Sequence, residues 1–398
     1  MAHTDTSIAA AMRRALTLGA RGHGRVSPNP AVGCVILDAD GRTVGQGWHQ
    51  RAGGPHAEVA ALQDARDRAR GGTAVVTLEP CRHTGRTPAC THALLDAGIR
   101  AVRYATGDPL HGGGAQELRQ AGLDVQHLPE FSADAAEMNR AWLTSVRLGR
   151  PHVTWKFAAT LDGRSAAADG TSRWITGETA RADAHHLRDT VDAVLIGAGT
   201  QRTDDPQLTV RPAPADGRQP LRVVLDPSGS TPPQARVLDT AAPTLLLQDP
   251  HTAASAAYPG HVHVAEVPRG DLDGALAALH RRGVGSVLLE GGPRLAGQFV
   301  AAGLVDEVIA YLAPALLGAG PAALADSAVA TITQTHRLEL TDVRRVGEDL
   351  RLTARPQPGP SNTNHTGRRE SDLHHPGRRE NAPNHPDQRR SDLADTPH

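Results

Sequence analysis

The segment Gly54-Pro55-His56-Ala57-Glu58 opens the run VAALQDARDRA at residues 59–69, which has the composition of a helix and stops at Gly71-Gly72. Apolar runs at residues 31–37, 73–78 and 101–106 have the length of buried strands, and a second helical stretch covers residues 88–97. Because strands and helices alternate, we expect an α/β domain over residues 1–147.

A second alternating series begins after Pro151. The pattern predicts strands at residues 152–158, 191–196 and 221–225, and a helix at residues 178–190. This order is typical of a mainly parallel sheet that binds its ligands at the carboxyl ends of its strands. We expect this second α/β domain to occupy residues 150–355.

The overall composition excludes several classes of protein. The chain has 398 residues, a formal net charge of -1 and three cysteines. A balanced charge gives no reason to expect a nucleic-acid partner, and three cysteines do not make a disulfide scaffold. No apolar run approaches the roughly 18 residues of a spanning helix. We therefore expect an unsecreted protein of the cytoplasm with no membrane partner. Residues 356–398 are poor in apolar residues, which predicts a disordered tail.

One His and two Cys in loop-and-helix settings predict a zinc site. His56 precedes the first helix, Cys81 follows the second strand, and Cys90 opens another helix. Three protein ligands leave a fourth position for water, as in catalytic zinc sites. Glu58 would then be a carboxylate beside the metal that carries protons, the arrangement of zinc deaminases. The alternative is a structural zinc with a fourth ligand from a nearby histidine, which would leave Glu58 unexplained.

The ten residues CRHTGRTPAC (residues 81–90) put eight residues between the two cysteines. Together with SPNPAVG (27–33) and GQGWH (45–49), this sequence resembles the deaminase half of the bifunctional riboflavin-biosynthesis deaminase-reductase. The resemblance implies a cytidine-deaminase-like α/β/α fold, Zn²⁺, and a pyrimidinone ribotide as substrate. It assigns substrate binding to Asn29, His49, His83 and Arg86. The family usually has Lys at Arg86 and Asn at Leu110.

Four segments in the second half of the chain resemble, in order and spacing, the reductase half of the same family. They are VTWKFAATLDGR (153–164), SRWITG (172–177), GAGTQRTDDPQLTVR (197–211) and LLEGGPRLAGQF (288–299), and none contains GxGxxG. The resemblance implies a dihydrofolate-reductase-like fold and NADPH. It places NADPH at Ala158, Trp174, Thr200, Gly292, Pro293, Arg294, Leu295, Ala296, Gly297 and Gln298. It places substrate at Ser172, Arg188, Asp204, Leu208, Arg211 and Glu290.

Lys156 is the one lysine among 42 basic residues. A compact ammonium at this position, where every other basic residue is Arg, suggests a chemical requirement that a planar guanidinium would not meet. We expect Lys156 and Asp204 to be catalytic in the reductase, since reduction of a ring-opened ribosyl imine needs groups that manage the accompanying proton.

The resemblance of both halves to this family implies two successive reactions. The first domain removes the 2-amino group of 2,5-diamino-6-(5-phosphoribosylamino)pyrimidin-4(3H)-one, and the second reduces the ribosyl group to give 5-amino-6-(5-phosphoribitylamino)uracil. We also expect a homo-oligomer. The alternatives are a zinc deaminase of another base or nucleotide with an appended reductase-like domain, and a binding module that keeps a structural zinc.

Overall fold

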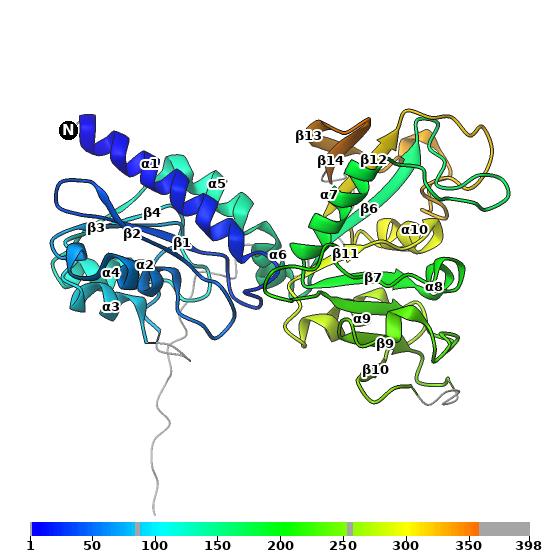
Figure 1. Cartoon of the computed structure of the whole chain (residues 1–398), viewed down its shortest axis with the longest axis horizontal. Coiled ribbons are helices and arrows are strands. Elements are labelled where there is room, and N and C mark those ends of the chain that lie inside the picture. The colour runs from blue at the N-terminus through cyan, green and yellow to red at the C-terminus, as the bar shows by residue number, and fades with distance from the viewer. Residues whose placement is uncertain (1, 84–87, 253–257, 358–398) are drawn as a thin grey trace, which may run out of the picture. The chain divides into compact units, whose positions relative to one another are not determined.

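The computed structural model describes residues 2–83, 88–252 and 258–357, which form two α/β domains (Figure 1). Arg86 and the predicted tail from residue 358 onward lie outside the described residues. Pro356, the first residue assigned to the tail from sequence, belongs to the last strand of the second domain. Among the described residues, no helix is both long enough and apolar enough to span a bilayer.

The first domain has a five-stranded sheet in the order β2-β1-β3-β4-β5. The β2–β1 and β1–β3 pairs are antiparallel, and the β3–β4 and β4–β5 pairs are parallel. Its strands and helices are α1 (Ala2–Gly19), β1 (Gly33–Leu37), β2 (Thr43–Trp48), α2 (Ala57–Ala65), β3 (Thr73–Val76), α3 (Cys90–Asp96), β4 (Ala101–Tyr104), α4 (Gly114–Gln120), β5 (Asp124–His127), α5 (Ser132–Met138) and α6 (Arg140–Leu148).

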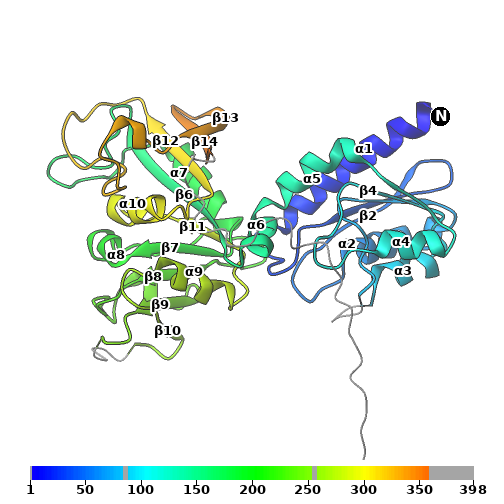
Figure 2. The ribbon, with the colours of Figure 1, turned by 180° about the vertical axis from the view of Figure 1, so that it is seen from behind.

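Helices cover both faces of this sheet. Because strand side chains alternate, Val35 and Leu37 of β1 pack with α1 and α5, whereas Cys34 and Ile36 pack with α2, α3 and α4. Figures 1 and 2 show α1 and α5 on one side of the sheet and α2, α3 and α4 on the other. Cys34 has no exposed surface, so it is a core residue as the sequence predicts.

Strand β2 is an element that the sequence pattern does not reveal. It contains Gly45 and Gly47, which have low strand propensity. A Cβ on Gly47 would lie 2.4 Å from the backbone nitrogen of Ala61 in α2. The strand therefore packs directly on the helix that begins after His56, and glycine is needed because the two backbones approach so closely.

The second domain has a nine-stranded sheet in the order β10-β9-β8-β7-β11-β6-β12-β14-β13. The pairs from β10 to β12 are parallel, as predicted, and β14 and β13 extend the sheet antiparallel. Its elements are β6 (His152–Thr160), α7 (Glu178–Asp189), β7 (Ala193–Gly197), α8 (Ala198–Asp204), β8 (Leu221–Leu225), β9 (Thr244–Gln248), β10 (Val262–Glu266), α9 (Leu272–His280), β11 (Ser286–Leu289), α10 (Pro293–Ala301), β12 (Glu307–Ala313), β13 (Leu338–Val346) and β14 (Asp349–Pro356).

The core of the second domain lies on both faces of the sheet. Helices α9 and α10 pack on one face through residues such as Leu279 and Phe299, and α7 packs on the other face through Leu187. The strands between them are buried on both sides, which explains their continuous apolar runs. Strand β7 ends at Gly197, directly before α8, and β11 ends at Leu289, directly before Glu290.

Two candidate active sites

Three metal-ligating side chains meet at the helix starts of the first domain. His56 immediately precedes α2, Cys81 follows β3, and Cys90 is the first residue of α3. His56 Nδ1 lies 3.2 Å from Cys90 Sγ and 3.5 Å from Cys81 Sγ, and the three ligand atoms lie within 4.8 Å of one another. Ligands around tetrahedral zinc are separated by about 3.5 to 3.8 Å, so the three side chains fit this ion.

The pKa values of the two thiols shift in opposite directions. A hydrogen bond from Cys90 lowers the pKa of Cys81 to about 4, and the same bond raises the pKa of Cys90. His56 hydrogen-bonds to Cys81, which raises the pKa of the imidazole. The surroundings of Cys81 therefore favour its thiolate, the form that binds a soft cation.

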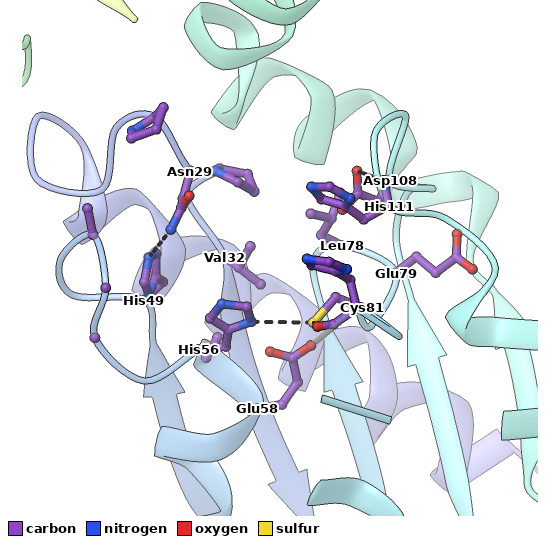
Figure 3. A pocket seen from close by; sticks show the side chains of 17 residues that line it. Asn29, Val32, His49, His56, Glu58, Leu78, Glu79, Cys81, Asp108 and His111 are labelled. Atoms are coloured by element: carbon purple, nitrogen blue, oxygen red, sulfur yellow. Dashed lines mark hydrogen bonds between the residues drawn. The ribbon is translucent and has the colours of Figure 1, made fainter. Parts of the chain in front are cut away.

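Glu58 is buried beside this cluster without belonging to it. Its side chain is 4% exposed, and Figure 3 shows the carboxylate turned toward His56 and Cys81. Burial, and then the charge of Cys81, raise the pKa of Glu58 to about 7. Among the described residues, the cluster that could hold a metal contains His56, Cys81 and Cys90 only. Glu58 is thus placed to exchange a proton near the metal rather than to bind it.

A cavity of about 340 Å³ opens onto this cluster (Figure 3). Asn29, His49 and His83 line it, as the sequence predicts. Asn29 Nδ2 donates to His49 Nε2 at 3.1 Å, and His49 Nδ1 donates to the Pro55 carbonyl at 3.0 Å. Burial lowers the pKa of His49, so the ring is neutral and its tautomer is fixed by these two partners. Sequence reasoning missed His111, which also lines this cavity.

The second candidate site is organised around Glu290, at the carboxyl end of β11. Arg188 of α7 donates two hydrogen bonds to the Glu290 carboxylate, of 2.6 and 3.0 Å. It also donates to the Thr209 carbonyl at 2.9 Å. Lys156 Nζ of β6 lies 3.9 Å from the same carboxylate. Burial opposes ionisation of Glu290, but the charges of Arg188 and Lys156 outweigh it and lower its pKa to about 2. Lys156, Arg188 and Glu290 thus come together from three elements.

The segment before β8 borders this cluster. His185 Nδ1 donates to the Thr209 carbonyl at 3.1 Å. Burial, followed by the charges of Arg188 and Arg211, lowers the pKa of His185 to about 4. Leu208, with φ at +56°, is nearly fully buried and packs with α7 rather than presenting a polar contact.

The residues expected to bind NADPH lie in β6 (Ala158), in the loop before α7 (Trp174) and at the starts of α8 and α10. Thr200 Oγ1 accepts the Gly292 N–H at 3.0 Å, which joins the beginning of α8 to the beginning of α10. Residues Pro293 to Gln298 form the first turns of α10. Backbone N–H groups at a helix start favour an anionic ligand such as phosphate.

Three further predicted residues lie in the loop before α7 and at the end of α8. Trp174 is 70% exposed and lies under the guanidinium of Arg181 at 4.4 Å from the ring centre, and Ser172 is half-buried two residues earlier. Asp204 is half-buried, and burial raises the pKa of its carboxyl, although Arg173 opposes the shift. Their contacts with cofactor or substrate stay predictions.

Comparison with known families matches both domains. The model of the RibD C-terminal domain matches residues 151–352, and that of the cytidine and deoxycytidylate deaminase zinc-binding region matches residues 5–106. The riboflavin biosynthesis protein RibD of Mycobacterium tuberculosis is 44% identical over 353 residues, which cover 87% of this chain and 97% of that protein. The Escherichia coli protein of the same name is 40% identical, covering 86% and 97%.

A solved structure shows the same architecture over nearly the whole length. The deaminase/reductase of Thermotoga maritima superposes with a TM-score of 0.82 and 34% identity, covering 89% of this chain and all of that one. The chain belongs to the RibD family.

As a RibD-family member, the protein is a bifunctional enzyme of riboflavin biosynthesis, a deaminase followed by a reductase. The expected fold class is confirmed, with a cytidine-deaminase-like first domain and a RibD reductase second domain. Its cofactors are Zn²⁺ and NADPH.

Proposed function

We propose that His56, Cys81 and Cys90 hold the zinc of the deaminase and that Glu58 is its proton carrier. The observation that carries this proposal is the triangle of ligand atoms, with the buried Glu58 carboxylate beside it. Zinc bound there supplies an acidified water for attack on the ring carbon that bears the 2-amino group. Glu58 takes a proton at its carboxylate and returns it to the leaving amine, a role suited to its pKa of about 7.

The walls of the cavity would orient the pyrimidinone ribotide. The Asn29 amide keeps a second N–H for the substrate and is held in place by its bond to His49, which is itself tied to the Pro55 carbonyl. Arg86 remains the predicted phosphate contact, on sequence grounds alone. This division puts the ring near Glu58 and the phosphoribosyl arm toward the opening.

In the reductase, the proposal rests on the Lys156–Glu290–Arg188 cluster. NADPH supplies hydride to C1′ of the ring-opened ribosyl group. Lys156 is the ammonium nearest to Glu290, and burial lowers its pKa, which makes proton donation easier. Asp204 is the second candidate for proton transfer. Arg188 fixes the Glu290 carboxylate, and Arg211 is the better candidate for the substrate phosphate because the Arg188 fork already faces Glu290.

One experiment separates the two half-reactions. The purified enzyme is incubated with the diaminopyrimidinone ribotide with and without NADPH, and ammonia and NADPH are measured separately. Ammonia should appear in both samples, and NADPH oxidation should follow ammonia release. NADPH oxidation without prior deamination would contradict the proposed order, and ammonia release from free cytosine or cytidine at a comparable rate would favour another deaminase specificity.

We also propose that the enzyme works in a reducing cytoplasm as a homo-oligomer with no nucleic-acid or membrane partner. The free cysteines and the need for zinc-bound thiolates support a reducing compartment. Light scattering of the purified chain at several concentrations measures the oligomeric state, and a monomer throughout would contradict the assembly.

A further inference from the structure

The loop between β4 and α4 forms part of the wall of the deaminase cavity. Asp108 and His111 of this loop line the cavity, and both are labelled in Figure 3. Leu110 does not appear among the described residues that line it, and its side chain is 53% exposed. The imidazole of His111 is therefore a polar side chain that this loop offers to a ligand.

The ring of His111 lies on the ring of His83. The two imidazoles are stacked, with centroids 5.4 Å apart and planes inclined by 12°. His83 follows the zinc ligand Cys81 by two residues and also lines the cavity. Since one face of the His111 ring is covered by His83, the ring edge, with its nitrogen atoms, remains to meet a substrate.

The position of His111 is fixed by its own loop. Asp108 Oδ1 accepts the N–H groups of Leu110 and His111 at 2.8 and 3.1 Å, which closes a tight turn. The hydrogen bonds hold the backbone of His111 in place, and the stack with His83 holds its ring.

The loop is also fastened to the segment that contains Cys81. Glu79 Oε1 accepts the N–H groups of Gly113 and Ala115, each at 2.9 Å, and Arg82 Nε donates to the Gly112 carbonyl at 3.2 Å. Three hydrogen bonds and the imidazole stack therefore tie residues 79–83 to residues 111–115. These contacts fix the position of His111 relative to Cys81.

We propose that His111 is a substrate-positioning residue of the deaminase, which donates a ring N–H to an oxygen acceptor on the phosphoribosyl arm of the substrate. This inference rests on the proposed deaminase site and deepens it. The arm, and not the ring, is the partner because the ring has to reach Glu58 and the zinc ligands, and Figure 3 shows Cys81 between Glu58 and His111. The acceptor is a sugar hydroxyl or a phosphate oxygen, which share this chemistry.

Three substitutions at His111 separate hydrogen bonding from stacking. His111→Ala removes both, His111→Phe keeps a flat ring without a donor, and His111→Gln keeps a donor without the ring. We expect the KM for ammonia release to rise about tenfold in the Ala and Phe variants, as loss of one good hydrogen bond implies, with kcat little changed. His111→Gln should recover part of the lost affinity.

The controls show whether the inference or the site itself fails. His263→Ala removes an exposed imidazole from β10 and should keep the wild-type KM. Zinc content and NADPH oxidation on deaminated substrate should be normal in all His111 variants.

A wild-type KM in His111→Phe would contradict the proposed hydrogen bond, and a fall in kcat at constant KM would make His111 part of the chemistry. If Glu58→Gln kept full deamination, the proposed site would fail independently of His111.

A truncated substrate identifies the acceptor. The dephosphorylated riboside keeps the sugar hydroxyls but lacks the phosphate. If His111 contacts a hydroxyl, His111→Phe should raise the KM for the riboside about as much as for the ribotide. If it contacts the phosphate, the substitution should have no effect on the riboside. A larger effect on the riboside than on the ribotide would contradict both forms of the proposal.

Discussion

Lys156 Nζ lies 3.9 Å from a carboxylate oxygen of Glu290. The same carboxylate accepts two hydrogen bonds from Arg188. The ammonium also lies 5.8 Å from the centre of the Tyr311 ring. The only lysine of the chain is therefore enclosed by an anion, a cation and an aromatic ring. A guanidinium in this position would be larger and planar, and it would compete with Arg188 for the same carboxylate.

Lys156→Arg should abolish or severely slow ribosyl reduction while deamination is unchanged. NADPH oxidation on already deaminated substrate measures the first activity, and ammonia release measures the second. General acid-base catalysis typically contributes about 10²- to 10⁴-fold, which is the scale of the expected loss. Near-normal NADPH oxidation would mean that the single lysine is an accident of composition.

Removal of zinc should abolish deamination and leave ribosyl reduction unchanged. Treatment with a strong chelator, or Cys90→Ser, should abolish ammonia release, because one of three ligands is lost and Cys90 is buried where another ligand cannot replace it. NADPH oxidation on deaminated substrate should continue. Cys34→Ser is the matched control, since Cys34 is buried in the core outside the ligand cluster. Full zinc content in Cys90→Ser would move the site elsewhere.

Glu58→Gln should separate metal binding from catalysis. The substitution preserves size and removes the proton carrier, so zinc content should stay at one per chain while deamination falls by about 10²- to 10⁴-fold. Elemental analysis and ammonia release on the same preparation provide the measurement. Parallel loss of zinc and activity would instead assign Glu58 a structural role.

The sequence predicted that His56, Cys81 and Cys90 come together, and it predicted most of the helices and strands, because each of these depends on local patterns. The helix that starts after His56 and the helical stretch predicted at residues 88–97 follow from composition and from the glycines that come after them. Gly98, directly after the second stretch, is in the left-handed conformation with φ at +70°. The strand at residues 221–225 matches β8 residue for residue.

What the sequence could not predict depends on contacts between distant segments. Strand β2 was missed because Gly45 and Gly47 obscure its pattern. Glycine is needed at both positions because the backbone of α2 lies too close to leave room for a Cβ. His111 was missed because its stack with His83 joins residues 28 positions apart in the chain. The two hydrogen bonds from Arg188 to Glu290 join residues 102 positions apart, so no local pattern reveals them, and the predicted substrate contact of Arg188 stays a prediction.

A cut after Gln357 should leave both activities and the thermal midpoint unchanged. The removed residues have too few apolar side chains to pack on either domain. The cut has to follow Gln357, because Pro356 pairs with Leu338 in the β13–β14 ladder and the Gln357 N–H donates to the Arg337 carbonyl at 2.9 Å. A large fall in the thermal midpoint of this variant would show that the tail contributes to stability.

The last prediction tests whether Arg188 acts through Glu290. Arg188→Lys keeps the positive charge but cannot make both hydrogen bonds to Glu290. Glu290→Gln keeps the shape of the side chain but removes its negative charge. If Arg188 mainly holds Glu290, each single variant should slow NADPH oxidation, and the double variant should be little worse than either, since both remove the same interaction. Arg282→Lys, at an exposed arginine bonded to the Ala278 carbonyl, is the matched control. Additive losses, with a rise in KM confined to Arg188→Lys, would instead mean that Arg188 binds the substrate phosphate directly.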